Sequence, residues 1–114
     1  HILASRYDAL LQRFPVRPLL RSKANRSAMH LYVIHVNADR RRQVFDHLRG
    51  RGVGVNVHYI PVHLQPYYRR FGFDKGDFPV AEQHYREAVS LPLYPGLTES
   101  EQELVVSALW EALQ

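Results

Sequence analysis

The residues best suited to chemistry in this 114-residue chain lie in one short segment, between Gly52 and His63. Its side chains include the amide of Asn56, the imidazoles of His58 and His63, and the phenol of Tyr59. These uncharged groups donate and accept hydrogen bonds, so they suit a site that holds a polar ligand. Tyr67, on the next predicted helix, extends the cluster. The segment indicates a binding site more than a self-contained catalytic one.

Residues 53–58 alternate between apolar and small or polar types, with the period of two that is typical of a β-strand. The two faces of this predicted strand are formed by Val53, Val55 and Val57, and by Gly54, Asn56 and His58. A face without long charged groups indicates close approach by another backbone or by a ligand. Pro61 then holds Ile60 extended, which predicts that Tyr59 and His63 lie on a stiff loop where binding residues are common.

Two other kinds of site are disfavoured by what the sequence omits. His58 and His63 form the best pair of metal ligands, but the chain has no Cys and no second matched pair to complete a tetrahedral shell. It contains no Gly-x-Ser-x-Gly motif, and the glycines at 50, 52 and 54 precede a predicted strand instead of a helix. We therefore expect neither a metal centre nor a serine nucleophile nor a dinucleotide site.

The net charge of +4 hides an asymmetry between the two halves of the chain. Residues 1–57 carry 11 basic and 3 acidic groups, whereas residues 58–114 carry 4 and 8. The Arg-rich half, with its run Arg40 to Arg42, keeps open a free-standing basic module that binds an anionic partner such as nucleic acid. The aromatic residues Tyr59, Tyr67 and Phe71 lie in the other half, so nucleic acid is the less favoured partner. A solvated helix face is the favoured interpretation of the run.

The predicted elements describe one α+β domain over residues 1–114, with a small sheet of about three strands and helices packed on one side. Strands are expected at 30–36, 53–58 and 89–91, and helices over about 1–14, 40–49, 66–72, 78–88 and from 98 onward. The last helix has the clearest start, a capping box formed by Thr98 and Glu101. No apolar run is long enough for a membrane span, so a cytoplasmic protein is expected. The chain enters a helix directly from His1, which reads as part of a longer protein.

Two stretches, residues 52–68 and 78–98, resemble the C-terminal part of the DegT/DnrJ/StrS family of nucleotide-sugar aminotransferases. The first reads Gly-Val-Gly-Val-Asn-Val-His-Tyr-Ile-Pro-Val-His, and the second ends Ser-Leu-Pro-Leu-Tyr-Pro-Gly-Leu-Thr. Within the family the chain is most similar to the pseudaminic acid branch, which acts on UDP-linked 4-keto-6-deoxy-N-acetylhexosamines. Many relatives have Thr where this chain has Val55, so a hydrogen bond from that position is lost.

The resemblance implies a fold-type I enzyme in which pyridoxal phosphate receives an amino group from glutamate and passes it to the sugar. In such enzymes a large domain holds the cofactor through a Schiff-base lysine, and a small domain closes over the substrate. Lys23 and Lys75 are the only lysines here, both in predicted loops. The chain would thus be the small domain, inactive alone and unable to bind the cofactor, with the catalytic residues upstream. The whole enzyme is expected to be a homodimer.

The same resemblance assigns substrate-binding roles to individual residues. His58 and Tyr59 match a His-Tyr pair on the substrate side of the small domain, and His63 follows in matching register. Asn56 would lie beside the substrate with Gly54, and Tyr67 would be a pocket wall. No catalytic, cofactor-binding or metal-binding residue is expected in the chain.

Overall fold

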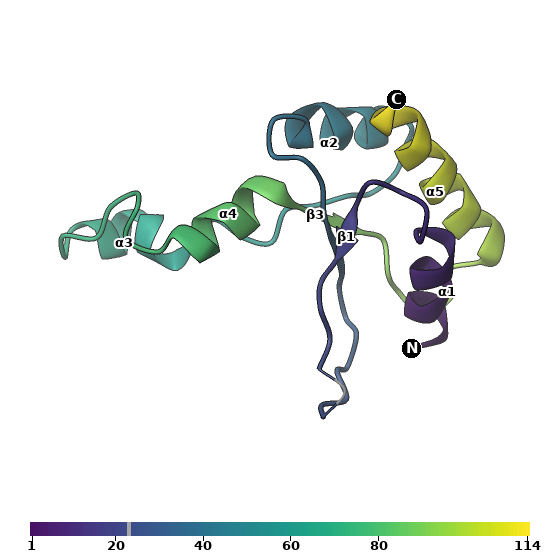
Figure 1. Cartoon of the computed structure of the whole chain (residues 1–114), viewed down its shortest axis with the longest axis horizontal. Helices are drawn as coiled ribbons and strands as arrows, with labels where there is room; N and C mark the ends of the chain where they lie inside the picture. Colours follow the sequence, from purple (N-terminus) through teal and green to yellow (C-terminus); the bar gives the residue numbers. More distant parts are fainter. Residues whose placement is uncertain (23) are drawn as a thin grey trace.

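A three-stranded antiparallel sheet forms the centre of the computed structural model, which describes residues 1–22 and 24–114 (Figure 1). Lys23, in the predicted loop, lies outside these described residues. In chain order the elements are α1 (Ile2–Leu10), β1 (Arg17–Pro18), β2 (Tyr32–His35), α2 (Arg41–Gly50), the 3₁₀ turn η1 (Val62–Leu64), α3 (Pro66–Arg69), α4 (Pro79–Glu87), β3 (Ala88–Leu91) and α5 (Glu99–Leu113). The predicted α+β class is confirmed.

The sheet has the order β1-β2-β3, with β2 in the middle. Val33 of β2 faces Ser90 of β3, and His35 faces Arg17 of β1 on the other side. The strands predicted at 30–36 and 89–91 are therefore confirmed. The third strand is β1, which the sequence analysis did not predict because of its prolines. Pro18 is tolerated there because an edge strand leaves some N–H groups without a ladder partner.

The strand predicted at 53–58 is wrong, although its alternation of buried and exposed residues is present. Val53 and Val55 are each 3% exposed, while Gly54 and Asn56 face solvent. The Val55 N–H donates to the Val53 carbonyl at 2.9 Å, so the segment turns on itself instead of offering that donor to a neighbour. Only Asn56 pairs with the sheet, through one isolated bridge to Ser90. The alternation of buried and exposed residues arises because two valines pack into the core, although the segment forms no ladder of strand hydrogen bonds.

The hydrophobic core lies between the sheet and the helices α1, α2 and α5, which gather around it in Figure 1. Each helix contributes fully buried side chains, and so do β2 and β3; they include Tyr7, Ile34, Val44, Leu48, Val89 and Leu109. Burying a side chain such as Leu48 stabilises a fold by roughly 1.5–3 kcal/mol. The sheet and these three helices thus form the stable body of the molecule.

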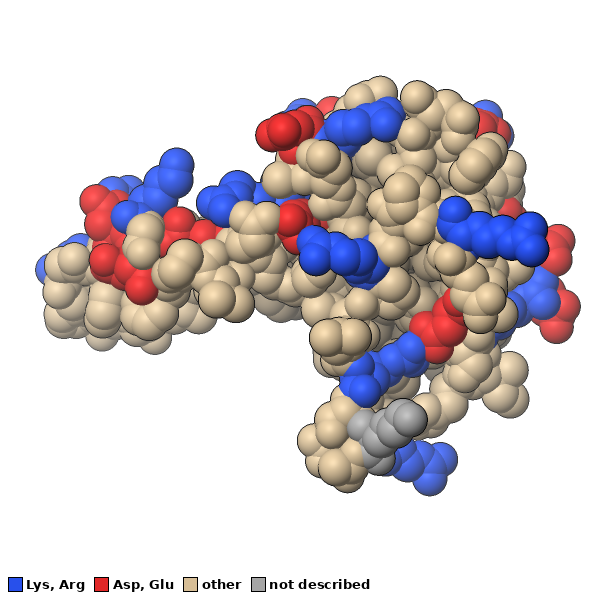
Figure 2. Space-filling model, viewed as in Figure 1, with Lys and Arg blue, Asp and Glu red and all other residues tan. Residues whose placement is uncertain are grey.

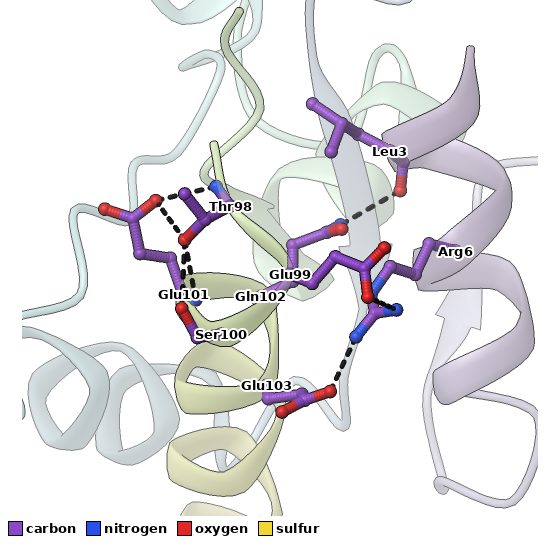
Figure 3. Close-up of polar contacts among 8 residues, drawn as sticks. All are labelled: Leu3, Arg6, Thr98, Glu99, Ser100, Glu101, Gln102 and Glu103. Atoms are coloured by element: carbon purple, nitrogen blue, oxygen red, sulfur yellow. Dashed lines mark hydrogen bonds and ion pairs between the residues drawn. The ribbon is translucent and has the colours of Figure 1, made fainter. Parts of the chain in front are cut away.

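Polar contacts at the start of α5 join it to α1 (Figure 3). The predicted capping box is confirmed: Glu101 N donates to Thr98 Oγ1 at 3.2 Å, and Thr98 N donates to Glu101 Oε2 at 2.7 Å. Arg6 of α1 reaches across to two glutamates of α5, Glu99 at 2.9 Å and Glu103 at 2.6 Å. These contacts fix α5, which covers one side of the candidate site described below.

Residues 62–87 form an arm that projects from the body, comprising η1, α3, a loop and α4 (Figure 1). The arm makes the molecule elongated, with extents of 47 × 35 × 24 Å. Charged groups of both signs lie along one edge of it, and the opposite edge is uncharged in the view of Figure 2. The helix predicted over about 78–88 is present as α4, in which Ala81 is exposed and the buried residue is Glu82.

No helix within residues 1–22 and 24–114 is long and apolar enough to cross a membrane.

Candidate substrate-binding site

Asn56 and His58 are held at the edge of the sheet by a single residue of β3, Ser90. The backbones of Asn56 and Ser90 exchange two hydrogen bonds of 3.2 and 2.8 Å. Two residues further on, His58 Nδ1 lies 2.8 Å from Ser90 Oγ. The structure therefore brings these two predicted binding residues together and fixes one of them through its side chain.

Tyr59 lies directly against His58. Their rings meet edge to face with centroids 4.6 Å apart, and the peptide bond between them is cis. The phenol ring is 71% exposed, so it is available to a ligand or to another protein surface. The predicted His-Tyr pair thus forms one aromatic unit, with His58 half-buried on the sheet and Tyr59 in solvent.

A hollow of about 670 Å³ opens beside His58, whereas Tyr59 lines a separate hollow together with α4. Its polar lining comes from three separate parts of the chain and includes His30, Asn56, His58, Ser90 and Tyr94. Gly54 also lines the hollow, and a Cβ built on it would meet nothing within 4 Å. The described residues therefore do not make the close approach expected at Gly54, and the space remains open to a ligand or a neighbouring domain.

The polar groups around the hollow suit a hydroxylated ligand. Amide, imidazole, hydroxyl and phenol groups each form directional hydrogen bonds without a net charge. The two charged residues at its border are already engaged within the protein: Arg51 is 2.7 Å from Glu111, and Glu101 belongs to the capping box. The hollow thus matches the polar body of a sugar better than a phosphate group.

His63 is placed differently from His58, because its side chain is only 6% exposed. Its Nε2 lies 2.9 Å from Glu82 Oε1, which also accepts a hydrogen bond of 2.7 Å from the Gly76 N–H. The Gly76 N–H and the His63 ring together lower the pKa of Glu82 below its usual value. In this structure His63 therefore joins η1 to α4 and to the loop of the arm.

Tyr67 lies on α3, out along the arm and away from the hollow beside His58 (Figure 1). Its ring is 56% exposed and carries the Arg70 guanidinium at 4.0 Å from the ring centroid, a cation–π contact. The described chain thus does not bring Tyr67 to His58. A role in the same site would require a further surface that spans both.

Two residues that shape the region, Ser90 and Glu82, were missed by the sequence analysis. Ser90 could have been noticed as the single polar residue between Val89 and Leu91 in a buried strand. Glu82 gave no comparable signal, because a glutamate in the first turn of a helix is ordinary. Only the folded contact with His63 distinguishes it.

Within residues 1–22 and 24–114 no lysine lines the hollow beside His58. Lys75 lies in an exposed loop of the arm, outside the hollow, and Lys23 lies outside the described residues. Within residues 1–22 and 24–114 no three metal-binding side chains come together either. The chemistry that the described residues supply is hydrogen bonding to a ligand.

A small antiparallel sheet with this helical cover is shared with solved pyridoxal-phosphate-dependent aminotransferases, so the chain is part of that fold. Residues 1–110 match the DegT/DnrJ/EryC1/StrS aminotransferase family, and the chain belongs to that family. The spore coat polysaccharide biosynthesis protein SpsC of Bacillus subtilis is 35% identical over 115 residues, covering 94% of this chain and 29% of SpsC.

Solved structures agree with this assignment. Spr1654 from Streptococcus pneumoniae, in its PMP form, superimposes with a TM-score of 0.90 at 26% identity, over 97% of this chain and 29% of that protein. It has also been solved in a PLP form. PseC of Helicobacter pylori, an aminotransferase of pseudaminic acid biosynthesis, gives a TM-score of 0.84 at 24% identity, over 98% of this chain and 31% of PseC. PseC thus shares the fold.

The chain spans less than a third of the length of these relatives. The structural match covers nearly all of this chain in each case, so the arm belongs to the shared fold.

Proposed function

We propose that this chain is the C-terminal small domain of a pyridoxal-phosphate-dependent sugar aminotransferase, and that it supplies the substrate side of the active site. In the whole enzyme an amino group passes from glutamate to a UDP-linked 4-keto-6-deoxy-N-acetylhexosamine, as in pseudaminic acid synthesis. The observation that carries the proposal is the hollow beside His58, whose polar lining groups are mostly uncharged, in a chain of an aminotransferase family. The cofactor and its lysine belong to a large domain upstream of residue 1.

In this proposal each predicted residue has a separate task. His58 and Asn56 hydrogen-bond the sugar, and Tyr59 covers it from the solvent side. His63 acts indirectly, because it fixes η1 and therefore the loop that carries Tyr59. Tyr67 contacts the substrate only when the large domain or the second subunit of a homodimer brings the arm and the hollow to one ligand.

The alternative, a basic module for nucleic acid, is not favoured by the arrangement of the arginines. Many are paired within the protein, for example Arg17 with Glu87 at 2.7 Å and Arg51 with Glu111 at 2.7 Å. On the face shown in Figure 2, the blue residues are scattered among red and tan ones instead of forming a stripe. A nucleic-acid surface requires a continuous set of unpaired cations.

The decisive experiment compares His58→Ala with the wild type in the full-length enzyme. We expect His58→Ala to raise the KM for the nucleotide sugar about tenfold or more, which corresponds to about 1.4 kcal/mol of binding. Covalent pyridoxal phosphate, read from its absorbance after gel filtration, should be retained. His47→Ala, on α2 and outside the hollow, serves as the control. Loss of the bound cofactor in His58→Ala, or unchanged kinetics, would contradict the proposal.

A further inference from the structure

Ser90 is a buried hydroxyl in a strand that is otherwise apolar. All four residues of β3 are buried, and Ser90 itself is 3% exposed between Val89 and Leu91. A buried hydroxyl without a hydrogen-bond partner costs free energy, so a serine at such a position needs a specific partner. That partner is His58, whose Nδ1 lies 2.8 Å from Ser90 Oγ.

The same serine is fixed to the body of the molecule through its backbone. It is paired with Val33 of the central strand β2, and on its other side it bridges to Asn56. The hydroxyl that meets His58 is therefore carried by a rigid element, in contrast to His58 itself, which lies in a segment outside any helix or strand. The sheet therefore fixes the position of the His58 imidazole through the Ser90 hydroxyl.

The hydrogen-bond inventory decides which atom of the pair carries the proton. A serine hydroxyl has one hydrogen, and within residues 1–22 and 24–114 the only side-chain partner of Ser90 Oγ is His58 Nδ1. If Nδ1 carried the proton and donated it, the buried Ser90 hydrogen would have no acceptor. Donation from Ser90 to Nδ1 satisfies both groups, and it places the imidazole proton on Nε2.

We propose that Ser90 is a positioning residue that holds neutral His58 in the Nε2–H tautomer, so that Nε2 presents a hydrogen-bond donor to a sugar oxygen in the hollow. This inference rests on the proposed function, and it narrows the ligand to one with an acceptor, a carbonyl or hydroxyl oxygen, at that point. The edge-to-face contact with Tyr59 holds the other side of the same ring.

The first test is a nuclear magnetic resonance measurement on the 114-residue chain labelled with ¹⁵N at histidine, above the pH at which imidazole is charged. We expect the Nδ1 of His58 to give the shift of an unprotonated nitrogen and Nε2 that of a protonated one. Ser90→Ala should move His58 toward a mixture of tautomers, whereas Ser90→Thr, which keeps the hydroxyl, should preserve the wild-type pattern. Ser107→Ala, on the exposed face of α5, is the control.

Each possible result of these measurements either supports the inference or overturns it. A wild-type His58 with the proton on Nδ1, or a Ser90→Ala spectrum identical to wild type, overturns the inference. If Ser90→Ala does not fold, the wild-type and Ser90→Thr spectra still decide it. In the full-length enzyme we expect Ser90→Ala to raise the KM for the sugar about tenfold with kcat less affected. Impairment by His58→Ala without any effect of Ser90→Ala refutes only this inference, whereas an inert His58→Ala refutes the proposed function.

Discussion

At the scale of single residues, the run Arg40 to Arg42 shows how the basic half of the chain is used. Arg40 donates to the carbonyls of Leu113 and Ala112 at 2.9 and 3.1 Å, at the C-terminal end of α5. Arg42 pairs with Asp46 one helical turn away, at 2.6 Å. A cation at a helix C-terminus satisfies carbonyls that have no partner within the helix and opposes the negative end of its dipole. Arg40 and Arg42 thus have separate structural roles.

Replacing Arg40 by Gln should therefore lower the free energy of unfolding by about 1 kcal/mol, since charge-assisted hydrogen bonds to the end of α5 are lost. Arg42→Gln is the matched control, because it removes the same charge from the same run but breaks only an exposed pair. Urea denaturation followed by circular dichroism measures both. Equal destabilisation by the two variants would show that total charge matters and the helix end does not.

Individual residues of the candidate site were predictable to the extent that they show in a local pattern. Asn56 and His58 were identified because a strand-like alternation with a small polar face is unusual, and their neighbours in the sequence make it visible. Ser90 and Glu82 act on residues 32 and 19 positions away. Such partners are set by the tertiary fold, so the sequence pattern around each of them contains little information.

At the scale of elements, a pair of histidines joins the arm to the sheet. His35 of β2 and His84 of α4 share a hydrogen bond of 2.8 Å between Nε2 and Nδ1. Burial, and next the proximity of His84, lower the pKa of His35 below its usual 6.5. Two charged groups also face the pair, Glu87 from α4 and Arg17 from β1, and they pair with each other at 2.7 Å. The junction therefore favours the neutral form of the His35 ring.

Because the folded state lowers the pKa of His35, it binds this proton less readily than the unfolded chain does. The contribution of His35 to the free energy of unfolding is therefore fully present above pH 6.5. It is lost as the pH falls through the pKa of His35 in the folded state. We expect the free energy of unfolding to fall more steeply as the pH decreases below 6.5 in the wild type than in His35→Gln. Denaturation at several pH values measures the slopes, and equal slopes would contradict the assignment.

Elements were predicted well where capping or turn residues agree with the periodicity, as at Thr98 and Pro66, and poorly where burial alone was the signal. Residues 53–58 alternate without forming a strand, since the Val53 carbonyl is already occupied by the Val55 N–H. The helix α4 packs within the arm as well as on the sheet, and its most buried side chain is a carboxylate, which the helical period does not indicate. Periodicity predicts a buried face without saying what covers it.

At the scale of the whole molecule, the body and the arm differ in how they are stabilised. The body has a continuous core of buried aliphatic and aromatic residues. In the arm, α3 has no buried residue, and Tyr67, Tyr68 and Phe71 are 56%, 40% and 61% exposed. The buried contact between His63 and Glu82 ties its turn, loop and helix together. The apolar side of α1, by contrast, is buried in the body through Ala4, Tyr7 and Leu11.

This difference predicts two levels of stability in the isolated chain. Amides of residues 62–78 should exchange with deuterium much faster than those of β2, β3, α2 and α5, because local opening of the arm exposes little new apolar surface.

The Glu82 carboxylate should hold the arm above pH 4.5, and its contribution should be lost as the pH falls below that value, since the folded state lowers its pKa. Glu82→Gln should therefore speed exchange in the arm at pH 7 and leave the body unchanged. Hydrogen exchange read by mass spectrometry tests this, with Asp46→Asn on α2 as the control, and uniform protection across arm and body would show that the chain unfolds as one unit.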